Sequence, residues 1–121
     1  MEIYTFTQET GKKITKFDSD FVMSRIIQTE QEARIGCLFL EENGIVGYHQ
    51  AVVPQLLLVV NGEGEVCGTN KEYVKVKEGD AVYWEKGEWH ETKTDTGLTA
   101  IVIESEQLSP ATFMTSSSRT I

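Results

Sequence analysis

The stretch GYHQAVVPQLLLVVNGEG, residues 47–64, decides the fold, because an apolar run follows a proline and ends in a glycine-rich turn. Short apolar runs that are bounded by turn residues are typical of β-strands. Side chains of an extended strand alternate between its two faces, so His49, Ala51 and Gln55 point to the same face. Pro54 marks a strand edge, a bend or a bulge, where this alternation can break. The stretch therefore predicts strands that place a histidine and an amide on one interior face.

Turn signals punctuate the rest of the chain about every eight to twelve residues. Valine, isoleucine, tyrosine and tryptophan are frequent in the short runs between these signals, and the chain has only two prolines. This pattern predicts an all-β sandwich or barrel. The predicted strands are residues 33–40, 45–53, 55–60, 72–77, 81–84 and 98–104.

Two further segments carry local structural signals. The sequence Glu42-Asn43-Gly44 is a clear hairpin signal, because Asn-Gly supplies the positive φ that a tight turn needs. We therefore expect the runs 36–40 and 45–49 to pair antiparallel. Residues 19–34 fit a helix face about as well as a strand. The strand FVMSRII is favoured there because its neighbours in the sequence are predicted strands.

The length of 121 residues suits one domain with a single core. Residues 1–32 are expected to form N-terminal strands that lead into the barrel, and residues 33–104 are expected to form its core. Residues 105–121 make a polar tail rich in serine and threonine. This tail is either loosely ordered or docked on the barrel through Phe113 and Met114.

The composition argues against several classes of partner. With 19 acidic and 11 basic residues the net charge is −8, which repels nucleic-acid phosphates and anionic membrane surfaces. No apolar run reaches the roughly 18 residues of a membrane span, and the first residues do not resemble a secretory signal. Cys37 and Cys67 are therefore expected to be reduced thiols in a cytoplasmic protein.

His90 is the only histidine besides His49, and it follows the turn at Lys86-Gly87 at the start of another predicted strand. A barrel built of hairpins can bring these two strands together. Two imidazoles and the amide oxygen of Gln55 would then suit a divalent ion that keeps open positions for water or substrate. The alternative is that both histidines are core or rim residues, hydrogen-bonded to their neighbours in the barrel.

The spacing of these residues resembles the two motifs of the cupin family, small antiparallel barrels that often hold a metal on their inner face. The first motif is matched, with its leading glycine displaced by one position, by Gly44, His49, Ala51, Gln55 and Gly62. The second motif is matched by Gly79, Glu85-Lys86-Gly87, His90 and Thr94. The resemblance covers residues 33–104 and includes the phrases NGEGEV and EGDAVYW. It implies an antiparallel β-barrel or double-stranded jelly roll.

The resemblance also implies a metal shell of three histidines and one glutamate. Carried over by position, His49 and His90 are kept, Ala51 stands in place of the second histidine, and Gln55 stands in place of the glutamate. A neutral amide leaves the charge of a divalent cation uncompensated in a low-dielectric cavity. We therefore expect either a weakened metal site, formed by His49, Gln55 and His90 and biased toward zinc, nickel, iron or copper, or no bound metal.

Aromatic and small residues near the two motifs are candidates for the wall of a ligand pocket. Plain core packing is the alternative, and it is favoured for the first of the two tryptophans. The candidates are Phe39, Ala51, Trp84 and Trp89. Phe39 and Cys37 are expected on the inner face of their strand, and alternation places Tyr48 on the outer face.

The sequence supports two functions almost equally. The slightly favoured one is a barrel that binds a small organic ligand, such as a sugar or an organic acid, in its interior. The alternative is a metal-dependent oxygenase, isomerase or lyase that acts on a small organic molecule. A third is a barrel whose site has decayed and which serves in assembly. Whether there is turnover, and through which catalytic residues, stays open.

The sequence also leads us to expect a homodimer. Cupin barrels commonly pair, and a short barrel gains stability when its edge strands are covered. The segment IYTF, residues 3–6, is a short strand that could cross to a partner subunit. We therefore expect this strand to form the dimer contact.

Overall fold

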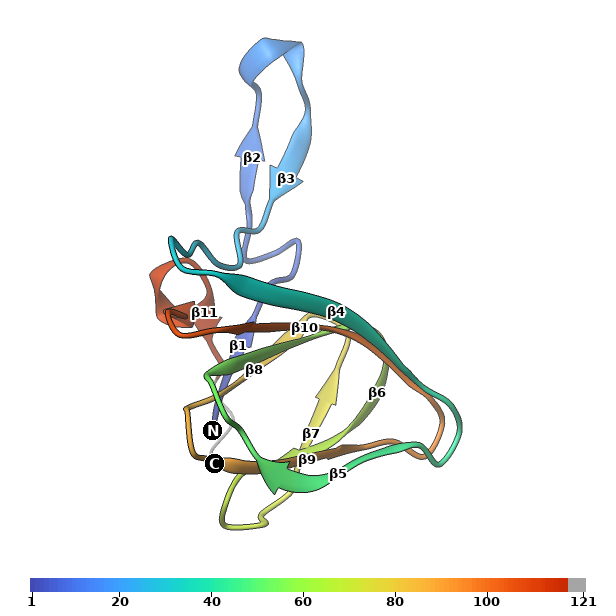
Figure 1. The fold of residues 1–121 in the computed structure, drawn as a ribbon. Helices are drawn as coiled ribbons and strands as arrows, with labels where there is room; N and C mark the ends of the chain where they lie inside the picture. The colour runs from blue at the N-terminus through green and yellow to red at the C-terminus, as the bar shows by residue number, and fades with distance from the viewer. Residues whose placement is uncertain (118–121) are drawn as a thin grey trace.

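The computed structural model describes residues 1–117, and its regular structure is almost entirely β-strand, as predicted (Figure 1). Within this range the helical elements are two short 3-10 turns, η1 (Lys16–Asp18) and η2 (Pro110–Thr112). Among the described residues, no helix is long and apolar enough to cross a membrane. The end of the predicted tail, residues 118–121, lies outside the described residues. The strands are β1 (Glu2–Thr5), β2 (Lys12–Ile14), β3 (Phe21–Met23), β4 (Ala33–Leu40), β5 (Ile45–Gln50), β6 (Gln55–Cys67), β7 (Val74–Lys77), β8 (Asp80–Trp84), β9 (Trp89–Lys93), β10 (Leu98–Ser105) and β11 (Thr115–Ser116).

The barrel consists of two antiparallel layers that share the long strand β6 (Figure 1). One layer has the order β11-β1-β8-β6-β10-β4, and in the other β7 and β9 flank β6 while β5 pairs with β9. The first half of β6 pairs with β8 and β10, and its second half pairs with β7 and β9. A single strand therefore passes from one layer to the other, which confirms the predicted jelly-roll barrel.

The bend in β6 depends on a glycine. Gly62 has a φ of +83°, a left-handed conformation that side chains with a Cβ rarely adopt. An added Cβ at this position would lie only 2.2 Å from the carbonyl oxygen of Gly97, the residue before β10. Asn61-Gly62 looks like a turn in the sequence, but here it bends one continuous strand between the two layers.

The turn at residues 41–44 differs from the prediction. Asn43 has the positive φ of +62° that its sequence predicts, yet β4 pairs with β10 and β5 pairs with β9. The expected hairpin between residues 36–40 and 45–49 is therefore wrong. The turn instead carries the chain from one layer to the other, alongside the turn at residues 94–97. Two backbone hydrogen bonds link the turns, from Asn43 N–H to Asp95 O (3.2 Å) and from Thr94 N–H to Gly44 O (3.1 Å).

Residues 19–34 form less regular structure than predicted. Phe21–Met23 form β3, which pairs only with β2, whereas residues 24–32 have no regular structure. The predicted strand FVMSRII is therefore confirmed at its start and wrong after Met23. Figure 1 shows the hairpin of β2 and β3 standing clear of the barrel.

Two apolar clusters hold the described chain together. The first fills the barrel between the two layers, with Leu57, Val82 and Trp84 from one layer and Val66 and Val76 from the other. The second lies on the outer face of the larger layer, where residues of the C-terminal segment cover the strands; it includes Tyr4, Leu56, Leu58, Ile103, Leu108 and Met114. The docking of the tail through Met114 is confirmed, and Phe113 is half-buried beneath the guanidinium of Arg25.

The N-terminal strand is paired within its own chain. β1 lies between β8, with Ile3 opposite Val82, and the short strand β11, with Tyr4 opposite Ser116. The segment IYTF is therefore part of its own barrel, whereas the sequence led us to expect it to cross to a partner.

The bend at Gly62 gives the first testable prediction. We expect Gly62→Ala to lower the free energy of unfolding by at least about 2 kcal/mol, because the new Cβ adds left-handed strain and a backbone clash. Urea unfolding followed by circular dichroism measures this change. Gly36→Ala is the matched control: no atom lies within 4 Å of its added Cβ, so we expect a change within about 0.5 kcal/mol. Equal effects of the two substitutions would contradict the role of Gly62.

Candidate functional site

The two histidines of the chain lie side by side in the second layer. β5 and β9 pair antiparallel with His49 directly opposite His90, and the centroids of their rings are 4.3 Å apart. The register shifts between Val46 and His49, so β5 carries one extra residue there. Bulges of this kind re-aim the side chains that follow them. The structure thus brings together the two imidazoles that the sequence placed on separate motifs.

His90 is buried without a polar partner. Its side chain is 3% exposed, and neither Nδ1 nor Nε2 has a hydrogen-bond partner within the described chain. Its ring packs against Trp84 at a centroid distance of 4.5 Å. An unsatisfied buried polar group costs roughly 1–3 kcal/mol, and native proteins contain few of them. The site therefore holds a polar side chain that a ligand or an ion can satisfy.

His49 provides the solvent-facing half of the pair. Its Nδ1 lies 2.7 Å from the carbonyl oxygen of Gly47, so Nδ1–H donates a hydrogen bond to that oxygen. This contact fixes the tautomer and leaves the lone pair of Nε2 available. The His49 side chain is exposed, whereas His90 is buried. A ligand can therefore approach the pair from the side of His49.

Burial also controls the charge of His90. Removal from water, together with the neighbouring His49, lowers the pKa of His90 from 6.5 to about 4. Both causes disfavour the imidazolium form. At neutral pH His90 is therefore a neutral imidazole, with one N–H donor and one lone pair.

Gln55 lies inside the barrel but is engaged elsewhere. It opens β6 opposite Trp84 and Glu104, and its Nε2–H donates to the Glu104 carboxylate at 3.3 Å. Glu104 was not among the site residues predicted from the sequence, although the alternation of Leu98, Ala100 and Val102 places it on the inner face of β10. Gln55 thus donates its hydrogen bond to a carboxylate and not to the histidines.

Ala51 takes the place of the second histidine in a tightly bonded corner. It is buried, its N–H donates to Glu88 O at 2.9 Å, and its carbonyl accepts from Gly87 N–H at 2.8 Å. These bonds hold the end of β5 against the turn that precedes His90. The methyl group of Ala51 offers no ligand atom.

The aromatic candidates divide between the two faces. Trp84 is buried in the barrel core, where its indole N–H donates to Cys67 O at 3.1 Å. Trp89 lies on the outer face and stacks on Tyr48 at 5.4 Å between centroids. Alternation turns the neighbour of an inward His90 outward, so Trp89 lies outside the barrel interior where the pocket was predicted. The outward position predicted for Tyr48 agrees with this stacking.

Phe39 does not face the barrel interior as predicted. It is 74% exposed, and Cys37 is exposed as well. Leu38 and Leu40 pack against the interior cluster instead. The expectation that Phe39 and Cys37 share the inner face of β4 is therefore wrong, because the alternate residues of this strand fill the core.

The donors present do not complete a metal shell. Within residues 1–117 no group of three or more histidine, cysteine, aspartate or glutamate residues is placed to hold an ion. Two imidazoles supply no negative charge, and the amide of Gln55 is bonded to Glu104. The residues at this site therefore do not fit the four-ligand shell that the motif spacing implied.

Comparison with known proteins gives the family. A family model described as "Cupin domain" matches residues 40–105, which is more than half of the chain. The chain therefore belongs to the cupin family, as its motifs and its jelly-roll barrel indicated. None of the curated proteins searched matches the chain.

Solved structures show the same fold. A Thermotoga maritima protein described as a predicted oxalate decarboxylase is 25% identical, with a TM-score of 0.56, over 60% of this chain and 66% of that one. The chain thus spans slightly less than two thirds of that protein. An RmlC-like cupin from Shewanella frigidimarina is 19% identical, with a TM-score of 0.59, over 65% and 70% of the two chains. A cupin superfamily protein from Desulfitobacterium hafniense is 12% identical, with a TM-score of 0.58, over 66% and 72%.

The buried imidazole predicts a pH dependence of stability. The unfolded chain binds a proton at His90 near pH 6.5, whereas the folded chain binds it near pH 4. The stability contributed by neutral His90 is therefore complete above pH 6.5 and is lost as the pH falls toward 4. The loss amounts to at most about 3 kcal/mol.

Two measurements check this prediction. Urea unfolding between pH 7 and 4 should show a smaller decline for His90→Phe than for the unsubstituted chain, because the variant has no proton to bind at this position. The His90 ring signals in an NMR titration should move near pH 4. Ring signals that titrate near pH 6.5 would contradict the burial argument.

Proposed function

We propose that this cupin binds a small organic ligand at the His49–His90 pair. The observation that supports the proposal best is the buried His90 ring, whose two nitrogens have no hydrogen-bond partner among residues 1–117. The side chain of His49 beside it is exposed, so a ligand can reach the pair from solvent on that side. A ligand that hydrogen-bonds to His90 removes the cost of this buried polar group.

The chemistry of the pair favours a hydroxyl-bearing ligand. A hydroxyl both donates and accepts, so it matches a neutral imidazole that has one donor and one lone pair. A carboxylate would approach a chain with a net charge of −8 and would meet a neutral ring at His90.

A metal-dependent enzyme is the second candidate. Two adjacent imidazoles are suitable ligands for zinc, nickel, iron or copper. Among an oxygenase, an isomerase and a lyase acting on a small organic molecule, the similarity to the Thermotoga maritima protein described as a predicted oxalate decarboxylase favours the lyase. Ala51 and Gln55 oppose this candidate, because they remove one ligand and the only anionic ligand of the shell.

We also propose that the protein acts in the cytoplasm. Both cysteines are free thiols, Cys37 exposed on β4 and Cys67 buried. A reducing compartment keeps such thiols from forming disulfides.

Ligand binding at the pair is directly testable. A panel of sugars, polyols and small organic acids is screened by thermal unfolding, with NMR detection of the His49 and His90 ring signals. We expect a hydroxyl-bearing ligand to shift both sets of signals and, at about 100 times its Kd, to stabilise the fold by about 2.7 kcal/mol.

His90→Phe tests the same proposal without enlarging the site. This variant removes the two ring nitrogens and should abolish the ligand effect while the chain stays folded. Trp89→Phe on the outer face is the control and should bind like the unsubstituted chain. A ligand that stabilises the His90→Phe variant equally would contradict the proposal, as would a panel in which nothing shifts the ring signals.

The metal candidate has its own test. We expect the unsubstituted chain to retain less than one-tenth equivalent of zinc or nickel after loading and dialysis, because no carboxylate completes the shell. Gln55→Glu should strengthen metal binding about tenfold or more, since it supplies an anionic ligand. Gln50→Glu makes the same change on an exposed side chain and serves as the control in calorimetric titration. One tightly held equivalent in the unsubstituted chain would favour the enzyme.

A further inference from the structure

A hairpin projects from the molecule and takes no part in the sheets of the barrel. We call residues 12–25 the arm; it contains β2, η1 and β3. Its two strands pair only with each other, in a separate two-stranded sheet. Figure 1 shows the arm pointing away from the barrel. A lone two-stranded hairpin is marginally stable in water, so the arm has little support from its own chain.

The arm exposes large apolar side chains. They lie at its tip and along β3, and both faces of β3 are exposed. Grouped exposed apolar residues are typical of interaction sites. The residues are Phe17, Phe21, Val22 and Met23.

Phe17 at the tip is disfavoured in two ways. It is 96% exposed, and its backbone is left-handed, with a φ of 59° and a ψ of 36°. Asparagine and aspartate adopt this conformation readily, whereas bulky residues rarely do. Water and backbone geometry both oppose a phenylalanine here, so a partner that covers its ring is the simplest reason for its presence.

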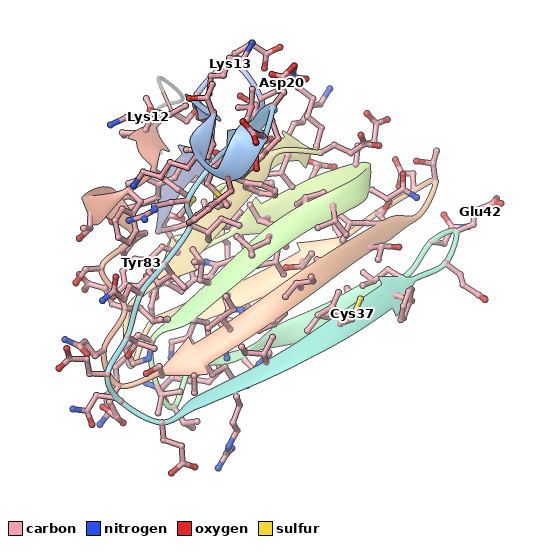
Figure 2. All side chains as sticks on the ribbon, turned by 90° about the horizontal axis from the view of Figure 1, so that it is seen from above. Lys12, Lys13, Asp20, Cys37, Glu42 and Tyr83 are labelled. Carbon is pink, nitrogen blue, oxygen red and sulfur yellow. The ribbon has the colours of Figure 1, made fainter. Side chains whose placement is uncertain are left out.

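A complementary surface lies on β4. This strand pairs only with β10, and its other edge is free within the described chain. Ile35, Cys37 and Phe39 alternate along its outer face and are all exposed. Figure 2 shows Cys37 on this strand at the margin of the sheet. A long apolar edge strand without proline or lysine is a site for association.

The distribution of charge indicates which partner fits the outer face of β4. The arm carries four basic and two acidic residues, a net charge of +2, so the rest of the chain carries −10. Acidic residues stand at both ends of β4, and Figure 2 shows Glu42 beyond its C-terminal end and Lys12 and Lys13 on the arm. A second copy of this chain therefore offers the arm both an apolar stripe and opposite charge. An anionic membrane would repel the rest of the chain. The acidic residues are Glu30, Glu32, Glu41 and Glu42.

We propose that the chain forms a two-fold dimer in which the arm of each copy packs on the outer face of β4 of the other copy. The arm points away from its own barrel, so this contact forms between copies. Two-fold symmetry makes the two contacts identical. The dimer does not depend on the ligand proposed for the histidine pair.

Sedimentation velocity tests the dimer with variants of both surfaces. Phe17→Asn removes the ring and suits the left-handed backbone, so the monomer keeps its unfolding midpoint. Ile35→Thr combined with Phe39→Thr removes the apolar stripe but keeps residues that favour strands. We expect twice the mass of one chain for the unsubstituted protein and a dimer Kd raised about tenfold or more in each variant. Val52→Thr, an exposed apolar residue outside both surfaces, is the control and should leave the Kd unchanged.

Mixing the two variants tests the exchange itself. The Phe17→Asn chain keeps an intact β4, and the Ile35→Thr/Phe39→Thr chain keeps an intact arm. An equimolar mixture restores one of the two contacts, so we expect more dimer than in either variant alone. Three results would overturn the proposal: an unsubstituted chain that is monomeric at roughly 100 μM, a dimer insensitive to Phe17→Asn, or a mixture without added dimer. A monomer that binds vesicles of anionic lipid through Phe17 would assign the arm to a membrane instead.

Discussion

The close approach of Gly62 to the Gly97 carbonyl is the constraint on which the barrel and its site depend. It allows β6 to bend and to pair first with β8 and β10 and then with β7 and β9. The second half of β6 also pairs with β9 and so fixes where His90 lies. Because β5 reaches the sheet only through β9, His49 is positioned by the same bend. The histidine pair is thus a consequence of a backbone contact in another part of the molecule.

Local sequence signals predicted the strands better than their partners. Alternation and turn residues located most of the strands, because both are properties of neighbouring residues. The pairing at residues 41–44 could not be predicted in this way. Asn43 has the same left-handed conformation in a hairpin and in a corner between layers. Which of the two forms is decided by the turn at residues 94–97, which is distant in the sequence and bonded alongside it.

Some residues of the site could likewise be predicted from the sequence, and others could not. His49 and His90 could be identified because they are the only histidines and fall at motif positions. Trp89 was predicted among the pocket residues, although alternation from His90 already turns its side chain outward. Phe39 was a harder case, because both faces of β4 are apolar and the sequence does not indicate which one is buried. Glu104 was missed because a charged residue at the end of a strand usually lies in water, whereas here it bonds Gln55.

Two residues lie in surroundings that are unfavourable for their side chains and so lower the stability of the fold. His90 is a polar ring in an apolar core, with no hydrogen-bond partner in the part of the chain that the structure describes. Phe17 is an apolar ring in water on a left-handed backbone. Sequences generally avoid such conflicts between a residue and its surroundings, and where conflicts persist they tend to lie at functional sites. The two residues lie in separate parts of the fold, one in the barrel and one on the arm. Their opposite chemistry argues for two different partners: a small polar molecule for the imidazole and an apolar protein surface for the phenylalanine.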